Sequence, residues 1–183
     1  MNGFSAAWLA LREPYDAHAR NADVFSAVAA LFKQRDLLRI VDLACGTGSA
    51  VRALGPRLAA RQNWRLADND LGLLADVVNM PTPKDVTVSA VALDLTRDLE
   101  AALEGPVDLV TASALLDLVS KTWLERLAME TAARSISLYA TLSYDGRIEL
   151  APLDPLDARP DGETLGMPVP PLPTVGLLGF IAG

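Results

Sequence analysis

The stretch Ile40-Val41-Asp42-Leu43-Ala44-Cys45-Gly46-Thr47-Gly48 decides the fold that this sequence predicts. It begins with an apolar run that is typical of a buried strand in a parallel sheet, and Asp42 closes that strand. The two glycines that follow allow a sharp turn and a close approach of the backbone to a ligand. A helix is expected to begin at Ser49. A strand, a glycine turn and a helix in this order hold a nucleotide-like ligand at the carboxyl end of a parallel sheet.

Two common nucleotide-binding motifs do not fit this stretch. The dinucleotide motif Gly-x-Gly-x-x-Gly fails because Val51 stands where its third glycine would fall. A phosphate loop is excluded because no Gly-Lys-Ser/Thr follows the turn. The missing third glycine argues against an NAD-dependent oxidoreductase. We keep such an enzyme as a third hypothesis, after the two that are given next.

The spacing Asp42-x-x-x-Gly46-x-Gly48 instead resembles motif I of the class I S-adenosyl-L-methionine (SAM) methyltransferases, over roughly residues 8–157. The resemblance implies a transferase, with SAM as its cofactor, that passes the sulfonium methyl group to an acceptor by in-line displacement. Alignment supplies much of the catalysis in such a transfer, so the catalytic residue stays unknown. We expect a small-molecule acceptor. The alternative is a catalytically inactive SAM-binding remnant or a non-enzymatic Rossmann-like domain.

Strands and helices are expected to alternate along the chain, which predicts an α/β fold with a doubly wound, mostly parallel sheet. The family resemblance implies a Rossmann-like core with three αβα layers and the strand order 3-2-1-4-5. The expected strands are residues 38–43, 64–67, 86–93, 107–112 and 135–143. The expected helices are residues 5–12 (ending before Pro14), 15–33, 49–61 (irregular at Gly55-Pro56), 71–78, 99–103 and 122–133.

The end of the chain departs from this pattern. Residues 1–157 are predicted to form one SAM-binding domain, in which helices within 5–33 cover the site. Near the end of this domain, a hairpin turn at Asp145-Gly146 is predicted to lead to a short strand over 148–151. Residues 158–183 are rich in proline and glycine and are predicted to form an irregular tail. We therefore expect an incomplete C-terminal part of the fold, from truncation or an altered reading frame.

The motif I loop is predicted to hold the amino-acid end of the donor. The resemblance implies that Asp42 orients the loop and the methionine moiety of SAM. It also implies that Ala44, Gly46 and Gly48 let the loop approach the ligand. Cys45 lies inside the turn, and the sequence places no base beside it, so it is interpreted as a small side chain rather than a nucleophile.

A second acidic group follows the next strand. Asp68 lies twenty residues after Gly48, where a Rossmann-like fold places the carboxylate that accepts two hydrogen bonds from a ribose diol. Asn69 is included in this predicted site, and Asp70 could share or replace the role of Asp68. An Asp or Asn in front of Leu71 could equally cap a helix.

The third and fourth strands end in further candidate ligands. The resemblance places the adenine ring at Ala92–Leu95, where Asp94 would accept a hydrogen bond from the amino group and the backbone of Leu95 would face the ring; Asp94 could also cap the next turn. Thr111 ends the fourth strand and would face the methyl donor and the acceptor. Asp117 is read either as an acceptor-orienting acid or as a surface residue.

Arg12 lies ahead of motif I on a predicted cover helix. A guanidinium matches a carboxylate in two hydrogen bonds, so Arg12 could meet the SAM carboxylate, or it could be solvated. His18, the only histidine, could act as a base but is more simply a surface residue on a helix.

Composition limits the remaining possibilities. The chain has 183 residues, the length of about one domain, and a net charge of −7, which disfavours nucleic acid as a partner. The single cysteine allows no internal disulfide and suits the cytoplasm. No run of about 20 apolar residues predicts a membrane span, and no cluster has zinc-ligand spacing, so no metal is expected. The sequence allows a homodimer.

Overall fold

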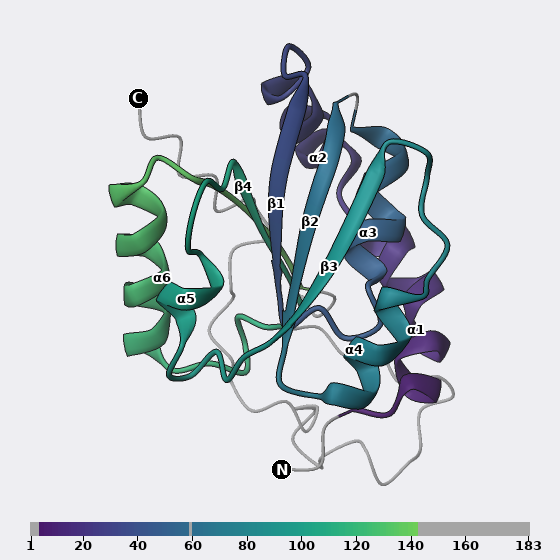
Figure 1. Cartoon of the computed structure of the whole chain (residues 1–183), viewed down its shortest axis with the longest axis vertical. Helices are drawn as coiled ribbons and strands as arrows, with labels where there is room; N and C mark the ends of the chain where they lie inside the picture. Colours follow the sequence, from purple (N-terminus) through teal and green to yellow (C-terminus); the bar gives the residue numbers. More distant parts are fainter. Residues whose placement is uncertain (1–3, 59, 143–183) are drawn as a thin grey trace, which may run out of the picture. The chain divides into compact units, whose positions relative to one another are not determined.

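The computed structural model describes residues 4–58 and 60–142 of the chain. Seven helical segments and five strands alternate along this part of the sequence (Figure 1). The helices are α1 (Ala6–Ala19), α2 (Ala22–Leu31), α3 (Ser49–Leu54), the 3₁₀ helix η1 (Gly55–Arg57), α4 (Leu71–Val78), α5 (Leu99–Ala102) and α6 (Lys121–Ala133). The strands are β1 (Leu37–Leu43), β2 (Arg61–Asp68), β3 (Val86–Ala92), β4 (Leu109–Ser113) and β5 (Ser137–Thr141).

The strands form one sheet in the order β3-β2-β1-β4-β5, and every neighbouring pair is parallel. This order confirms the α/β fold class and the strand order that the resemblance implied. β1 lies in the middle, paired with β2 on one side and with β4 on the other. The order turns back between β1 and β4, and a ligand in such a sheet lies at the carboxyl ends beside that switch point. The motif I loop follows β1 at this place.

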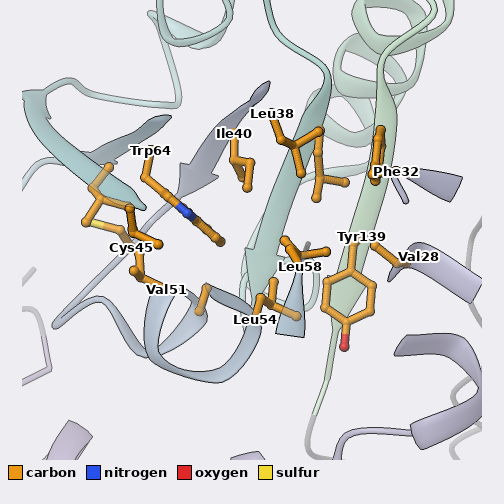
Figure 2. Close-up of a cluster of buried hydrophobic side chains, with 14 of the residues drawn as sticks. Val28, Phe32, Leu38, Ile40, Cys45, Val51, Leu54, Leu58, Trp64 and Tyr139 are labelled. Carbon is orange, nitrogen blue, oxygen red and sulfur yellow. The ribbon is translucent and has the colours of Figure 1, made fainter. Parts of the chain in front are cut away.

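Helices cover both faces of the sheet, which gives the predicted three layers (Figure 1). Side chains of a strand point alternately to its two faces. Leu38 and Ile40 of β1 pack in one core cluster, to which α2, α3 and α4 also contribute (Figure 2). Val41 and Leu43 pack in a second cluster with residues of α5 and α6. By the same alternation Asp42 belongs to the α2 face of the sheet.

The predicted break at Pro14 is wrong, because α1 runs through this proline to Ala19. A proline inside a helix removes one hydrogen bond, here the one that Ala10 would accept, and costs about 3 kcal/mol. Pro14 and Ala10 are both exposed, so water can satisfy the freed carbonyl. The chain breaks instead at Asn21, whose side chain accepts hydrogen bonds from the backbone N–H groups of Asp23 and Val24 and so caps α2.

The irregularity predicted at Gly55-Pro56 is confirmed, but the helix ends there instead of continuing to residue 61. Strand β2 begins at Arg61, earlier than the predicted start at Trp64, and it includes Gln62, a polar residue that is buried. The Gln62 side chain donates to the carbonyls of Gly55 and Leu58 at 2.8 and 3.2 Å and accepts from the Trp64 indole N–H at 2.8 Å. The predicted turn at 145–146, strand at 148–151 and tail over 158–183 lie outside the described residues.

Replacing Gln62 by alanine tests this buried network. The change leaves the Trp64 indole N–H and two carbonyls without partners, so we expect unfolding to become easier by about 2–4 kcal/mol. Urea denaturation followed by tryptophan fluorescence measures the effect. Arg61→Ala, at an exposed position of the same strand, is the control and should change stability by less than about 0.5 kcal/mol. If Gln62→Ala lowers the free energy of unfolding by no more than the control does, the buried hydrogen bonds of Gln62 do not stabilise the fold as proposed.

Candidate functional site

The loop after β1 folds as the glycine spacing predicts. Gly46 and Gly48 have φ angles of 53° and 80°, in the left-handed region that favours glycine. Ala44 also adopts a positive φ, 54°, which the sequence alone does not indicate. The backbone N–H of Cys45 donates to the carbonyl of Ala67 at 3.1 Å. These contacts hold the loop against the end of β2.

Asp42 lies in the middle of the site, 1% exposed, at the register position beside Thr111. The Thr111 hydroxyl donates to its Oδ1 at 2.6 Å. Burial raises the pKa of Asp42 to about 7, although the Thr111 hydrogen bond and the charge of Arg20 act in the opposite direction. A bound cation favours the ionised form of a carboxyl group. A cationic ligand beside Asp42 would therefore lower the pKa of this carboxyl and be paired with the carboxylate.

Cys45 is buried beside Asp42. Burial, with the charges of Asp42 and Asp68 as smaller causes, raises the pKa of its thiol well above the ordinary value. A thiol is a nucleophile only after it loses its proton, so this cysteine stays protonated and unreactive. The structure agrees with its interpretation as a small side chain in the turn.

The Asp68 carboxylate ties the end of β2 to the motif I loop. Its Oδ2 accepts from the Gly46 N–H at 2.9 Å and its Oδ1 from the Asp70 N–H at 3.0 Å. An ionised carboxylate has about four acceptor positions, so two further hydrogen bonds can still be accepted. The capping role belongs to Asp70, which accepts from the N–H groups of Gly72 and Leu73 at the start of α4. Asn69 is exposed between these two acids.

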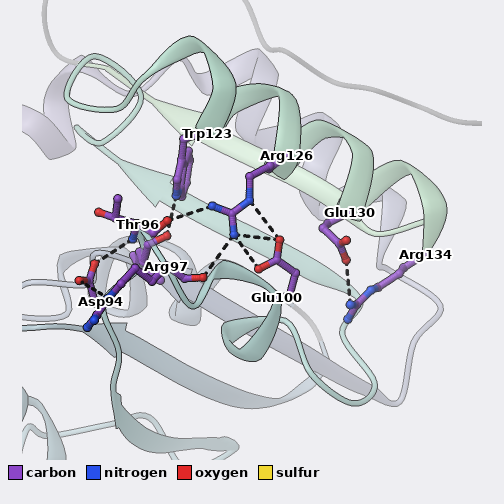
Figure 3. Close-up of polar contacts among 9 residues, drawn as sticks. Asp94, Thr96, Arg97, Glu100, Trp123, Arg126, Glu130 and Arg134 are labelled. Carbon is purple, nitrogen blue, oxygen red and sulfur yellow. Dashed lines mark hydrogen bonds and ion pairs between the residues drawn. The ribbon is translucent and has the colours of Figure 1, made fainter.

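Asp94 lies in a tight turn after β3 (Figure 3), closed by a hydrogen bond from the Arg97 N–H to the Asp94 carbonyl, and Leu95 is the second residue of this turn. The Asp94 carboxylate accepts from the Thr96 N–H and from Arg97 Nε, each at 3.0 Å, and the Thr96 hydrogen bond is the main reason for a lowered pKa. The carboxylate therefore stabilises its own turn instead of capping α5, which Asp98 precedes. The Trp123 indole donates to the Leu95 carbonyl at 2.7 Å and fixes the turn to α6.

The tips of β2 and β3 are joined directly. The Leu93 N–H donates to the Asp68 carbonyl at 2.9 Å, which places the adenine segment predicted at residues 92–95 next to the predicted ribose acid. The three acids that the sequence singled out, Asp42, Asp68 and Asp94, thus lie at or just after the ends of three neighbouring strands of the sheet, β1, β2 and β3. Their roles toward a ligand stay predictions.

A small cavity of about 60 Å³ lies between α1 and the motif I loop. Five predicted site residues line it: Arg12, Asp42, Ala44, Cys45 and Gly46. The remaining predicted residues do not line it: Gly48, Asp68, Asn69, Asp94, Leu95 and Thr111. Ser113 and Ala114, at the end of β4, also border the space. Ser113 belongs to the strand end, 111–113, that the resemblance placed toward the donor and the acceptor, whereas Ala114 was not predicted.

The chain's own side chains limit this cavity. A Cβ atom on Gly46 would lie 3.2 Å from Leu9 Cδ1, and one on Gly48 would lie 2.9 Å from Met80 Sδ. Sites for ligands of this size commonly enclose about 300–1,000 Å³, so a SAM-sized ligand requires Leu9, which lines the cavity from α1, to move outward. Helix α1 has no buried residue, so its packing opposes such a movement only weakly.

The inner face of α1 is charged. Arg12 forms two hydrogen bonds with Asp16, at 2.7 and 3.1 Å, and its guanidinium lies 4.8 Å from the centre of the Trp8 ring. Glu13 forms two hydrogen bonds of 2.6 Å with Arg52, whose Nη1 also donates to the Thr47 carbonyl at 2.6 Å. Arg52 therefore clasps α1 to the motif I loop, a role that no sequence signal predicted.

The other candidates lie apart from the cavity. His18 is exposed in the last turn of α1, and Asp117 is exposed in the turn that precedes α6. Within residues 4–58 and 60–142 no three His, Cys, Asp or Glu side chains are grouped to hold a metal ion. No helix of this part of the chain has the length and apolar character needed to cross a bilayer.

Comparison with known proteins supports the fold. No protein-family model and no curated protein matches the sequence. The plantazolicin methyltransferase BpumL in complex with SAH aligns with a TM-score of 0.56 at 13% identity, over 75% of this chain and 51% of that one. A second structure of BpumL, with a monoazolic desmethylPZN analog and SAH, gives a TM-score of 0.55 at 14% identity, over the same shares.

Motif I indicated a resemblance to the SAM-dependent methyltransferases, and these alignments confirm it at the level of the fold. The chain has the Rossmann-like core of the SAM-dependent methyltransferases. It spans about half the length of the structures that it matches.

The stability of the folded chain should depend on pH through Asp42. Its raised pKa means that the folded state keeps a proton that the unfolded chain releases near pH 4, so this group reduces stability as the pH rises from about 4 to 7. Asp42→Asn removes the effect. The variant should be more stable than the parent by about 2–4 kcal/mol at pH 8 and about equal at pH 4.

Urea denaturation at pH 4, 6 and 8 measures this difference. The matched control is Asp76→Asn, an exposed position in α4, which should follow the parent at all three pH values. A difference between Asp42→Asn and the parent that does not change with pH would show that the carboxyl does not titrate in this range.

Proposed function

We propose that this protein is a SAM-dependent methyltransferase acting on a small-molecule acceptor. The observation that carries the proposal is the glycine loop after β1, with the buried Asp42 at its start and Asp68 hydrogen-bonded to Gly46. The similarity of this fold to two structures of the methyltransferase BpumL in complex with SAH supports the proposal. SAM would supply an electrophilic methyl group on a sulfonium cation.

The residues present fit the parts of this cofactor. The positive φ angles of Gly46 and Gly48 form a backbone cradle in which an added side chain would collide with Leu9 or Met80. Asp42 provides a negative charge for the cationic end, and the remaining acceptor positions of Asp68 suit a ribose diol. Asp94 and the backbone of Leu95 would meet the adenine ring. Arg97 would have to leave Asp94, and its exposed fraction of 76% permits this.

Within this proposal the chain contributes to the transfer by orientation and by excluding water. The closing of α1 over the loop, held by Glu13 and Arg52, would bury the reacting atoms. Ser113 and Ala114 border the cavity at the end of β4, beside Asp42, and would face the acceptor. We assign no proton transfer, because no described residue at the cavity has the geometry of a base acting on an acceptor.

One observation favours a second candidate, a SAM-binding domain without transferase activity. The chain spans about half the length of the methyltransferase structures that it matches. Acceptor pockets of this fold are built from variable added segments, so a chain of this length could bind the donor and lack the acceptor site. Donor binding followed by an acceptor panel separates the two candidates.

Isothermal titration calorimetry with SAM, S-adenosylhomocysteine and NAD tests the proposal directly. We expect binding of the first two and none of NAD. Asp68→Asn should weaken SAM binding by about 1–3 kcal/mol, because the ribose loses a charged acceptor. Asp76→Asn makes the same change at an exposed position and should leave the affinity unchanged.

The possible outcomes point in different directions. If neither SAM nor S-adenosylhomocysteine binds, the proposed function is wrong. SAM binding without methyl transfer to any of a panel of amines, phenols, thiols and carboxylic acids would favour the inactive domain. Unchanged affinity in Asp68→Asn would remove this carboxylate from the ribose site while leaving the rest of the proposal standing.

A further inference from the structure

Arg20 joins the link between α1 and α2 to the tips of two strands. Its Nη1 donates to the Thr141 hydroxyl at 3.3 Å and its Nη2 to the Ser113 hydroxyl at 3.2 Å. The two hydroxyls are themselves 3.3 Å apart, at positions that are register partners in β4 and β5. A guanidinium therefore lies at the carboxyl ends of these strands, next to a residue that borders the cavity, Ser113.

Within the part of the chain that the structure describes, two buried polar side-chain groups have no hydrogen-bond partner, Arg20 Nε and the Tyr139 hydroxyl. Arg20 also has no carboxylate within ion-pair distance among the described residues, whereas Arg12 and Arg126 each form two or more hydrogen bonds with a carboxylate. Buried polar groups in folded proteins are almost always paired, and an unpaired one calls for an explanation. Its cost is largest for a charged group.

The two unpaired groups belong to the same face of the sheet. Tyr139 and Thr141 are two residues apart on β5, so their side chains point to one side. Figure 2 shows the Tyr139 ring beside Val28, with the hydroxyl at the edge of the apolar cluster. Asp42 lies on the same face, and the Arg20 charge lowers its pKa without ion-pair contact. Arg20, Ser113 and Thr141 thus gather at the end of β4 and β5, and Tyr139 lies two residues before that end on the same side of the sheet.

We propose that Arg20, with the hydroxyls of Ser113, Thr141 and Tyr139, forms a subsite that binds a carboxylate carried by the methyl acceptor. The inference rests on the proposed function. The planar guanidinium donates two parallel hydrogen bonds to a carboxylate, and its Nε–H is one of the two donors in one such arrangement. An amine or an apolar acceptor group would leave that donor unsatisfied. A carboxylate would satisfy Nε and neutralise the buried charge.

The donor also carries a carboxylate, at its methionine end, and this is the other source of the same chemistry. The position of Arg20 favours the acceptor, because it contacts the tips of β4 and β5 and has no hydrogen bond with the motif I loop. Arg12, which lines the cavity from α1, is the residue that the resemblance assigned to the donor carboxylate.

Side-chain NMR of the full chain provides the test. The Nε–Hε resonance of Arg20 is assigned by its loss in Arg20→Lys. Sodium acetate is added to the protein, with sodium chloride at equal ionic strength as the control. Both titrations are repeated after saturation with S-adenosylhomocysteine. We expect a saturable shift with acetate alone. Tyr139→Phe and Ser113→Ala should each weaken acetate binding at least about threefold, and Arg61→Lys, at an exposed position of β2, should not.

Tyr139→Phe separates binding from structure. Removing an unpaired buried hydroxyl leaves stability unchanged or higher, so a loss of acetate binding in this stable variant supports the subsite. If Arg20→Lys fails to fold, the Tyr139 and Ser113 variants still decide the outcome. An equal response to acetate and chloride, or none to either, would overturn the inference.

The source of the carboxylate is decided with 5′-methylthioadenosine, which lacks the amino-acid end of the donor. If S-adenosylhomocysteine shifts the Arg20 signal and blocks acetate while 5′-methylthioadenosine does neither, the subsite serves the donor and the acceptor assignment is wrong. If acetate binds but S-adenosylhomocysteine does not, the proposed function fails and the carboxylate subsite remains.

Discussion

A hydrogen bond of 2.9 Å from the Gly46 N–H to Asp68 Oδ2 joins the two central parts of the site. It requires a left-handed turn at Gly46, which a glycine adopts without strain, and an acid at the last position of β2. The parallel pairing of β1 with β2 brings these two positions to the same edge of the sheet. Together with the hydrogen bond from the Cys45 N–H to the Ala67 carbonyl, this contact holds the loop against the tip of β2.

The fold could be predicted from the sequence because its main signals are local. The apolar run over 38–43, the glycines at 46 and 48 and the alternation of strand and helix patterns all point to the same architecture. The two failures have different causes. Pro14 is tolerated inside α1 because its side of the helix is exposed to water. Gln62 lies in a buried strand because a tertiary contact outweighs its polar character: its amide finds three partners.

The candidate site was only partly visible in the sequence for the same reason. Asp42 and Asp68 follow strands with recognisable patterns, so their positions could be inferred. Arg52 and Arg20 act through partners 39 and 121 residues away, Glu13 and Thr141, and no spacing rule connects such pairs. Helix α1 adds a further difficulty, since its polar residues face the site while Leu11 and Tyr15, which a helical pattern would place inward, are 70% and 75% exposed.

The charges on the α2 face of the sheet, around Asp42, indicate what kind of ligand this region suits. A buried acid with a pKa near 7 and a half-buried arginine without a carboxylate partner occupy the same face of the sheet. Neither charge is fully compensated by the described residues, because Asp42 accepts a hydrogen bond from one hydroxyl and Arg20 donates hydrogen bonds to two. An environment with one unsatisfied group of each sign suits a ligand pair in which one member is cationic and the other anionic. The carboxyl ends of β1, β4 and β5 therefore carry charges that would suit the cationic donor and the acidic acceptor proposed above.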